Sequence, residues 1–125
     1  MELQQGQIFT HTFVVTSQMS AIQVGSGLVD VLSTPAMIAQ MEKFASQDIA
    51  KFLQPNEVTV GFDINVKHLL PSKIGTTIKC VTTVTQIVKN RIGLTIEVTE
   101  NDKTVATATH TRVIVDKKRF IEGLK

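Results

Sequence analysis

The sequence predicts an α+β fold, in which an antiparallel sheet covers one long helix. One segment, residues 34–53, shows helical periodicity, and the four segments after it are rich in β-branched residues and joined mainly by short turns. A further segment with strand character, Ile8–Thr16, precedes the helix. An order of one strand, one helix and four strands is typical of an antiparallel sheet packed against a single helix.

The helix is expected to run from Thr34 to Leu53, beginning at Ser33-Thr34-Pro35 and ending at Gln54-Pro55-Asn56. Proline is well tolerated in the first turn of a helix. It disfavours helical geometry in the residue before it, so a later proline commonly follows the end of a helix. The segment 18–33 before the helix contains two glycines and several small residues, which predicts a loop with a short extended piece. Apolar residues recur at helical steps of three and four on one predicted face: Ile38, Met41, Ala45, Ile49 and Phe52.

The remaining strands alternate apolar and polar residues. The strand Glu57–Leu70 is expected to place Val58, Val60, Phe62, Ile64 and Val66 on one face. The later strands are expected over Thr76–Lys89, residues 92–98 and Thr104–Val115, with a tight hairpin at Lys89-Asn90-Arg91 and a turn at Asn101-Asp102.

A single sheet of this kind leaves its two edge strands unpaired, and natural proteins pair or protect such edges. A symmetric dimer that joins two sheets edge to edge is one solution. We therefore expect a homodimer, with a dimer of dimers as a further possibility.

The composition is that of an ordinary globular protein, with 125 residues, 42% hydrophobic and 19% charged, and it suits one domain over residues 1–125. A net charge of +2 is too small to predict a nucleic-acid partner. No apolar run is long enough to span a bilayer, and the first residues lack the pattern of a secretory signal. The single cysteine, Cys80, excludes an internal disulfide or a cysteine metal cluster, which favours a cytoplasmic protein without a metal.

An imidazole falls on the apolar face of the strand 57–70. His68 shares the parity of the apolar residues of that strand, so regular pleating points it toward the core. Such a histidine is most often satisfied by a backbone carbonyl, and position alone favours that interpretation. A bulge in the strand would change the parity.

Two carboxylates lie within the apolar arc of the helix. At about 100° per residue, Glu42 falls between Ile49 and Leu53, and Asp48 also falls inside the arc. A buried carboxylate needs a partner, whereas one at the edge of the arc reaches solvent. The helical wheel does not choose between these interpretations.

Thr34 has two interpretations at the helix start. A threonine before proline is typical of an N-cap that satisfies a free backbone N–H. A helix N-terminus also offers free N–H groups and partial positive charge, which suit an oxyanion. Taken by itself, the pattern favours the cap.

Other polar residues give weaker signals. Cys80 lies on a strand and is expected to be an inert small residue. His11 and His110 lie on strands among polar neighbours, which predicts surface or hydrogen-bonding roles. The basic run Lys117-Lys118-Arg119 is typical of a solvated chain end.

Three segments of the chain together resemble the fluoroacetyl-CoA thioesterase-like group of the hotdog superfamily. They are STPAMIAQME, VGFDINVKHLLPSKIG and ATATHTRVIVDKKRF, and the likeness runs from about Val24 to Phe120. That family carries a threonine at a helix start, a glutamate eight residues later, and a glycine seven residues before a histidine in the next strand. The matching residues are Thr34, Glu42, Gly61 and His68, followed by Thr-His-x-Arg at 109–112.

The resemblance implies a hotdog fold, in which a sheet wraps a long central helix and two active sites lie at a dimer interface. It implies hydrolysis of an acyl-CoA thioester to free acid and CoA, with Thr34, Glu42 and His68 as catalytic residues and Gly61 and Arg112 at the substrate. Coenzyme A is then part of the substrate, and no separate cofactor is expected.

The implied roles follow from the chemistry of each group. His68 would transfer protons, Glu42 would activate water or attack the carbonyl, and Thr34 would be the nucleophile or would position water. Direct attack by water and a covalent acyl-enzyme both stay open. If both were helical, Thr34 and Glu42 would lie about 12 Å apart along the axis, so they reach one carbonyl only if Thr34 folds back or if they come from different subunits.

The substrate contacts are implied in the same way. Gly61, without a side chain, would let the acyl group approach the strand backbone. As the alternative to a solvated chain end, the charges of the basic run 117–119 with Lys89, Arg91 and Arg112 would instead meet the phosphates of CoA.

The region before the helix departs from the family. The fluoroacetate-specific member has an aromatic-rich lid there, whereas this chain has no aromatic residue between Phe13 and Phe44. We therefore expect a short or medium acyl group other than fluoroacetyl. The fold alone would equally suit a non-catalytic acyl-CoA-binding sensor or scavenger, or a hydratase, but the complete Thr/Glu/Gly/His set favours hydrolysis.

Overall fold

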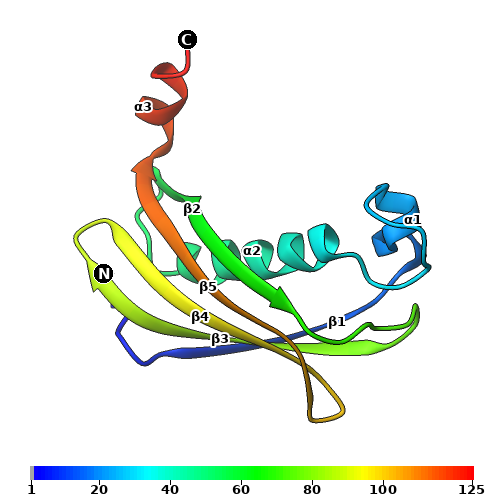
Figure 1. Ribbon diagram of the computed structural model, residues 1–125. Helices are drawn as coiled ribbons and strands as arrows, with labels where there is room; N and C mark the ends of the chain where they lie inside the picture. The colour runs from blue at the N-terminus through cyan, green and yellow to red at the C-terminus, as the bar shows by residue number, and fades with distance from the viewer. Residues whose placement is uncertain (1) are drawn as a thin grey trace.

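Five antiparallel strands form one sheet, and the long helix lies across one of its faces (Figure 1). The computed structural model describes residues 2–125. The strands lie in the order β1-β3-β4-β5-β2. This arrangement confirms the predicted α+β class. The strand bounds are β1 (Ile8–Val14), β2 (Glu57–His68), β3 (Thr77–Val88), β4 (Arg91–Glu100) and β5 (Lys103–Asp116).

The long helix, α2 (Thr34–Ala50), begins at the predicted residue and ends slightly before the predicted limit of Leu53. The Ser33 hydroxyl caps it by accepting a hydrogen bond from the Ala36 N–H at 3.1 Å. Pro35 lies in the first turn, where backbone N–H groups have no partner within the helix, so its missing N–H costs no hydrogen bond. The helix face toward the sheet is buried: Met37, Met41, Phe44, Ala45, Asp48 and Ile49.

The inner face of the sheet packs on this helix in two apolar clusters. The first surrounds the N-terminal half of α2 and includes Ile78, Ile96 and Val98, and the second surrounds the C-terminal half and includes Val84 and Leu94. Burial of each large apolar side chain contributes about 1.5–3 kcal/mol, so this contact fixes the helix on the sheet.

Strand β2 contains a bulge that changes which residues face the helix. Its register with β5 shifts between Gly61 and Asp63. Beyond the bulge the odd–even pattern holds, with Ile64 and Val66 packed against the core and His68 on the same side. Before the bulge the parity is reversed, because Thr59 and Gly61 lie opposite the inward-facing Ile114 and Arg112, and Phe62 in the bulge is 60% exposed. The expectation that Val58, Val60 and Phe62 share the face of His68 is therefore wrong.

The segment before α2 is more ordered than a loop. It contains a 3-10 turn, η1 (Ser17–Met19), and a short helix, α1 (Ala21–Val24), which ends at Gly25 with φ of 86°. The expected extended piece is present as isolated bridges that pair Ser20 with Leu32 and Val31 with Lys73.

A second short helix, α3 (Lys117–Glu122), follows β5 and was not predicted from the basic run in this region. It begins because the Asp116 carboxylate accepts a hydrogen bond from the Arg119 N–H at 3.0 Å. Strands β1 and β2 form the two edges of the sheet. Over residues 2–125, no helix combines the length and the apolar character that a membrane crossing requires.

Candidate active site

The Thr34 hydroxyl and the His68 ring meet where the start of α2 faces the end of β2. The distance from Thr34 Oγ1 to His68 Nδ1 is 2.8 Å. Thr34 is free for this contact because Ser33, and not Thr34, caps the helix. The interpretation of Thr34 as the N-cap is therefore wrong, and its hydroxyl is directed to an imidazole instead.

The His68 ring lies in an environment that favours its neutral form. Burial lowers the pKa of His68 below its ordinary value of 6.5, and the nearby Leu70 backbone partly opposes this shift. Its second ring nitrogen, Nε2, is buried and has no hydrogen-bond partner among the described residues. A neutral imidazole beside a hydroxyl can accept a proton, which is the requirement for a general base.

A cavity of about 320 Å³ opens at this pair. Thr34 and His68 both line it, and volumes near this value suit a small ligand. The rest of the lining comes from three segments that fold together around the helix start: Ala21, Ser26, Val31, Leu32, Ser33, Leu69, Leu70 and Pro71.

Glu42 lies further along α2 and faces β2 at Gly61. Its side chain is 41% exposed, and its Oε2 lies 3.4 Å from Arg112 Nη1. A Cβ atom built on Gly61 would lie only 2.6 Å from Glu42 Oε2, so the missing side chain makes room for this carboxylate. In this chain the space above Gly61, which was expected to admit the acyl group, is thus occupied by Glu42.

Arg112 is buried beneath Glu42 and is held by several hydrogen bonds. Its Nε donates to Thr59 Oγ1 at 2.8 Å, and its Nη2 donates to the Thr59 carbonyl at 3.1 Å. Burial lowers the pKa of Arg112, and the Glu42 carboxylate opposes that shift. This guanidinium is buried, whereas the basic run at 117–119 is exposed, and the contact of Arg112 with the substrate stays a prediction.

His110 continues this network behind Arg112. Its Nδ1 lies 2.8 Å from the Asp63 carbonyl and its Nε2 lies 3.3 Å from Arg112 Nη1. A carbonyl only accepts and a guanidinium only donates, so the ring is neutral, with its proton on Nδ1. Burial lowers the pKa of His110, with the Asp63 backbone opposing it, which agrees with this protonation. The predicted hydrogen-bonding role of His110 is confirmed.

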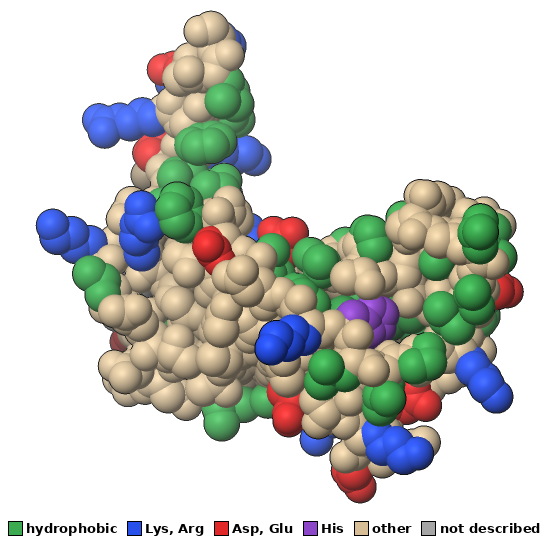
Figure 2. Space-filling view, in the orientation of Figure 1, with side chains coloured by type: hydrophobic (Ala, Val, Ile, Leu, Met, Phe, Trp, Pro, Cys, Tyr) green, Lys and Arg blue, Asp and Glu red, His purple; other side chains and the backbone are tan. Residues whose placement is uncertain are grey.

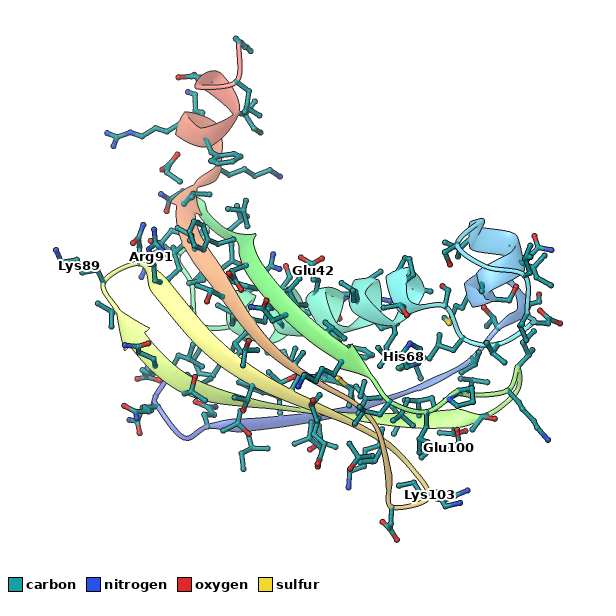
Figure 3. All side chains as sticks on the ribbon, viewed as in Figure 1. Glu42, His68, Lys89, Arg91, Glu100 and Lys103 are labelled. Carbon is teal, nitrogen blue, oxygen red and sulfur yellow. The ribbon has the colours of Figure 1, made fainter. Side chains whose placement is uncertain are left out.

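The chain therefore forms two centres on the helix-facing side of the sheet. Thr34 and His68 make one, and Glu42, Gly61 and Arg112 make the other, with no hydrogen bond between Glu42 and His68 in residues 2–125. Figure 3 labels Glu42 on α2 and His68 at the end of β2. No sequence signal pointed to Thr59, which holds Arg112. The Ser33 cap next to Thr34 was also missed, although a serine directly before a helix start is itself a capping signal.

Asp48, and not Glu42, is the fully buried carboxylate of the helix. It lies 2.7 Å from His11 Nε2 through Oδ2, and the His11 ring stacks on Phe44 with centroids 4.5 Å apart. His11 thus has the hydrogen-bonding role that was expected of it. Burial raises the pKa of the nearby Cys80 thiol to about 11, which supports the inert role predicted for it.

Solved structures of similar fold are hotdog-type proteins. The fluoroacetyl-CoA thioesterase FlK matches with a TM-score of 0.92 at 21% identity, covering 98% of this chain and 95% of that chain. A hot-dog-like protein from Thermanaerovibrio acidaminovorans gives 0.88 at 22% identity, covering 96% and 89%. A thioesterase superfamily member from Thermus thermophilus gives 0.87 at 22%, covering 99% and 92%. The fold is therefore the hotdog fold.

The sequence profile of the fluoroacetyl-CoA-specific thioesterase family matches residues 15–118. That match spans most of the chain, and the protein belongs to this family of thioester hydrolases. Among curated proteins, no sequence shows significant similarity to this chain. The predicted family, fold and enzyme class are confirmed.

Proposed function

We propose that this protein hydrolyses a short or medium acyl-CoA thioester, with Thr34 and His68 acting at the thioester carbonyl. The observation that carries the proposal is the 2.8 Å contact between Thr34 Oγ1 and His68 Nδ1 at the mouth of a cavity. Structures of mutants of FlK have been determined with acetyl-CoA and with fluoroacetate and CoA, which supports a small acyl group. The single buried thiol, Cys80, supports a cytoplasmic setting.

The chemistry needs one base and a positioned oxygen. Neutral His68 accepts a proton from the Thr34 hydroxyl, or from a water that this hydroxyl orients, while the new C–O bond forms. The C–S bond then breaks, and the proton passes to the leaving sulfur. If Thr34 is the attacking oxygen, a water activated by His68 then hydrolyses the Thr34 ester, which releases the free acid and restores the hydroxyl. A thiolate with a thiol pKa of about 8.5 needs only modest acid assistance, so a single imidazole suffices.

A homodimer joined through β2 offers a way to bring Glu42 to this centre. Strand β2 is an edge strand with one side unpaired in the described chain. If two β2 strands pair antiparallel over their full length about a two-fold axis, Glu57 lies opposite His68 of the partner subunit. In that register Gly61 of the partner subunit lies opposite Ile64.

This pairing shortens the path between the two centres. Within one chain, Gly61 and His68 are seven residues apart, about 23 Å along the strand. Across the pair the separation along the strand is four residues, about 13 Å. We therefore assign Glu42 and Arg112 of one subunit to the site formed by Thr34 and His68 of the other, with Arg112 orienting the carboxylate.

A thiol-release assay with acyl-CoAs of increasing chain length tests the proposal. Wild type should turn over a short or medium acyl-CoA, and His68→Ala and Glu42→Ala should each lose about a hundredfold in kcat, the effect of removing an acid–base group. Glu97→Ala, an exposed carboxylate on the outer sheet face, is the matched control and should keep full activity.

Three results would contradict parts of this scheme. Unchanged rates in both site variants would remove those residues from the mechanism. Acyl-CoA binding without turnover in wild type would favour a non-catalytic sensor. A monomer by sedimentation at micromolar concentration would exclude the shared site.

A further inference from the structure

The C-terminal helix α3 stands away from the rest of the molecule with its apolar side chains exposed (Figures 1 and 2). Phe120 and Ile121 of α3 and Leu124, in the turn directly after it, are exposed apolar residues, and we call these three the arm patch. Leu124 is 73% exposed, and no residue of α3 is buried. A helix of one or two turns is unstable by itself in water, so α3 needs a surface to pack against.

A second apolar surface lies at the opposite end of β2. Leu69 and Leu70 directly follow the strand, and Leu28 before α2 is 95% exposed. Residues of both segments line the cavity at Thr34 and His68. We call this surface the α1 patch, and its exposed members are Ile22, Val24, Leu28, Val29, Leu69 and Leu70.

The two patches lie at opposite ends of the same unpaired strand. The Lys117 N–H donates to the Asn56 carbonyl at 2.9 Å, which anchors α3 beside the start of β2. Figure 2 shows a hollow between α3 and α1, with hydrophobic side chains along it. Antiparallel pairing of two β2 strands would bring the start of one strand to the end of the other. Each arm patch would then meet the α1 patch of the second copy, and the contact would occur twice by symmetry.

The cavity at Thr34 and His68 lacks the charges that coenzyme A requires. Within the described chain its lining includes no lysine or arginine, whereas the phosphates of CoA are strongly anionic. The arm begins with three cations in succession, at 117–119, and β2 pairing would carry them to the mouth of the partner's cavity. Charged heads on long apolar stems suit this position, because the stems can lie on an apolar surface.

We propose that α3 packs on the α1 patch of the partner subunit and that its basic run binds the CoA phosphates at the partner's site. The inference rests on the proposed function. The apolar contact would hold the arm, and Lys117 and Lys118 would supply the charge that each site lacks within its own chain.

Charge removal combined with a pair of substrates tests the phosphate contact. The double variant Lys117→Gln/Lys118→Gln should raise KM for the acyl-CoA about tenfold, as expected for two screened lysine–phosphate contacts. The KM for the matching acyl-pantetheine, which has the same reacting end without these phosphates, should not change. Lys79→Gln/Lys103→Gln makes the same change in net charge on exposed strand positions and should leave both KM values as in wild type.

A subunit-mixing experiment tests whether the arm acts on the partner. His68→Ala is mixed with the double lysine variant after reversible dissociation. If the arm serves the partner, each mixed dimer holds one site with an intact His68 and an intact arm, and an equal mixture regains about a quarter of wild-type activity at low acyl-CoA concentration. If the arm serves its own chain, every intact His68 has a defective arm, and no low-KM activity returns.

The outcomes separate this inference from the function beneath it. A wild type without turnover of any thioester would refute the proposed function. Turnover with the same acyl-CoA KM in wild type and the double lysine variant would overturn the phosphate contact alone. If the arm packs on the partner subunit, Ile121→Asp should raise the dimer dissociation constant. An unchanged dissociation constant in that variant would overturn the docking.

Discussion

A methyl group added at Gly61 should separate the effect of Glu42 on activity from its effect on stability. In Gly61→Ala the new Cβ would lie 2.6 Å from Glu42 Oε2, against 3.4 Å for ordinary contact, so the carboxylate must move by about 0.8 Å. A misplacement of about 1 Å in a catalytic group costs up to about a hundredfold in rate. We expect kcat/KM to fall by about 30- to 100-fold.

Stability should change little in the same variant. Alanine restricts the unfolded chain more than glycine does, which favours folding by about 0.4–1 kcal/mol and offsets part of the strain. Urea unfolding should therefore give a free energy within about 1 kcal/mol of wild type. A large loss of kcat/KM with little change in the free energy of unfolding would show that the added methyl group acts by displacing the Glu42 carboxylate.

A double-mutant cycle with Glu42→Ala provides the control. If Gly61→Ala acts through the carboxylate, it should have almost no further effect once the carboxylate is absent. Thiol release measured for wild type, the two single variants and the double variant gives the coupling free energy between Gly61 and Glu42. Additive losses in the double variant, or full activity in Gly61→Ala, would refute the reasoning.

Two further predictions concern the helix start and the buried histidine. Ser33→Ala removes the cap of α2 and should lower the free energy of unfolding by about 1 kcal/mol, measured by urea denaturation against Ser17→Ala, an exposed serine outside the helix. Because burial lowers the pKa of His110 below 6.5, its neutral form stabilises the fold above that pH, and this contribution is lost as the pH falls through the lower folded-state pKa. Between about pH 8 and about pH 5, the free energy of unfolding should fall less in His110→Gln than in wild type. An equal fall in both proteins would contradict the assignment.

Local sequence patterns determined the elements of this fold. Helical periodicity and the Ser33-Thr34-Pro35 start located α2, since these signals act within a few residues. The turn between β4 and β5 was predicted from Asn101 and Asp102, which adopt φ of 49° and 67°, a conformation that these side chains tolerate. The motif spacing also identified the family before any geometry was known.

Tertiary structure decided which of these residues meet. The bulge at Phe62 reverses the faces of β2, and a single extra residue is not visible in an alternating pattern. The helical wheel could not separate Glu42 from Asp48, because their difference depends on Gly61 and His11, which lie on strands distant in sequence.

The placement of the candidate site has the same physical origin. Arg112 carries a charge, and charged residues are rarely buried unless they are paired, yet this one is buried and contacts Thr59, His110 and Glu42. Local propensity depends on neighbours along the chain, whereas burial and pairing depend on contacts between elements. The sequence alone therefore determined the elements and the family, and only the folded chain decided that Thr34 contacts His68 while Glu42 contacts Arg112.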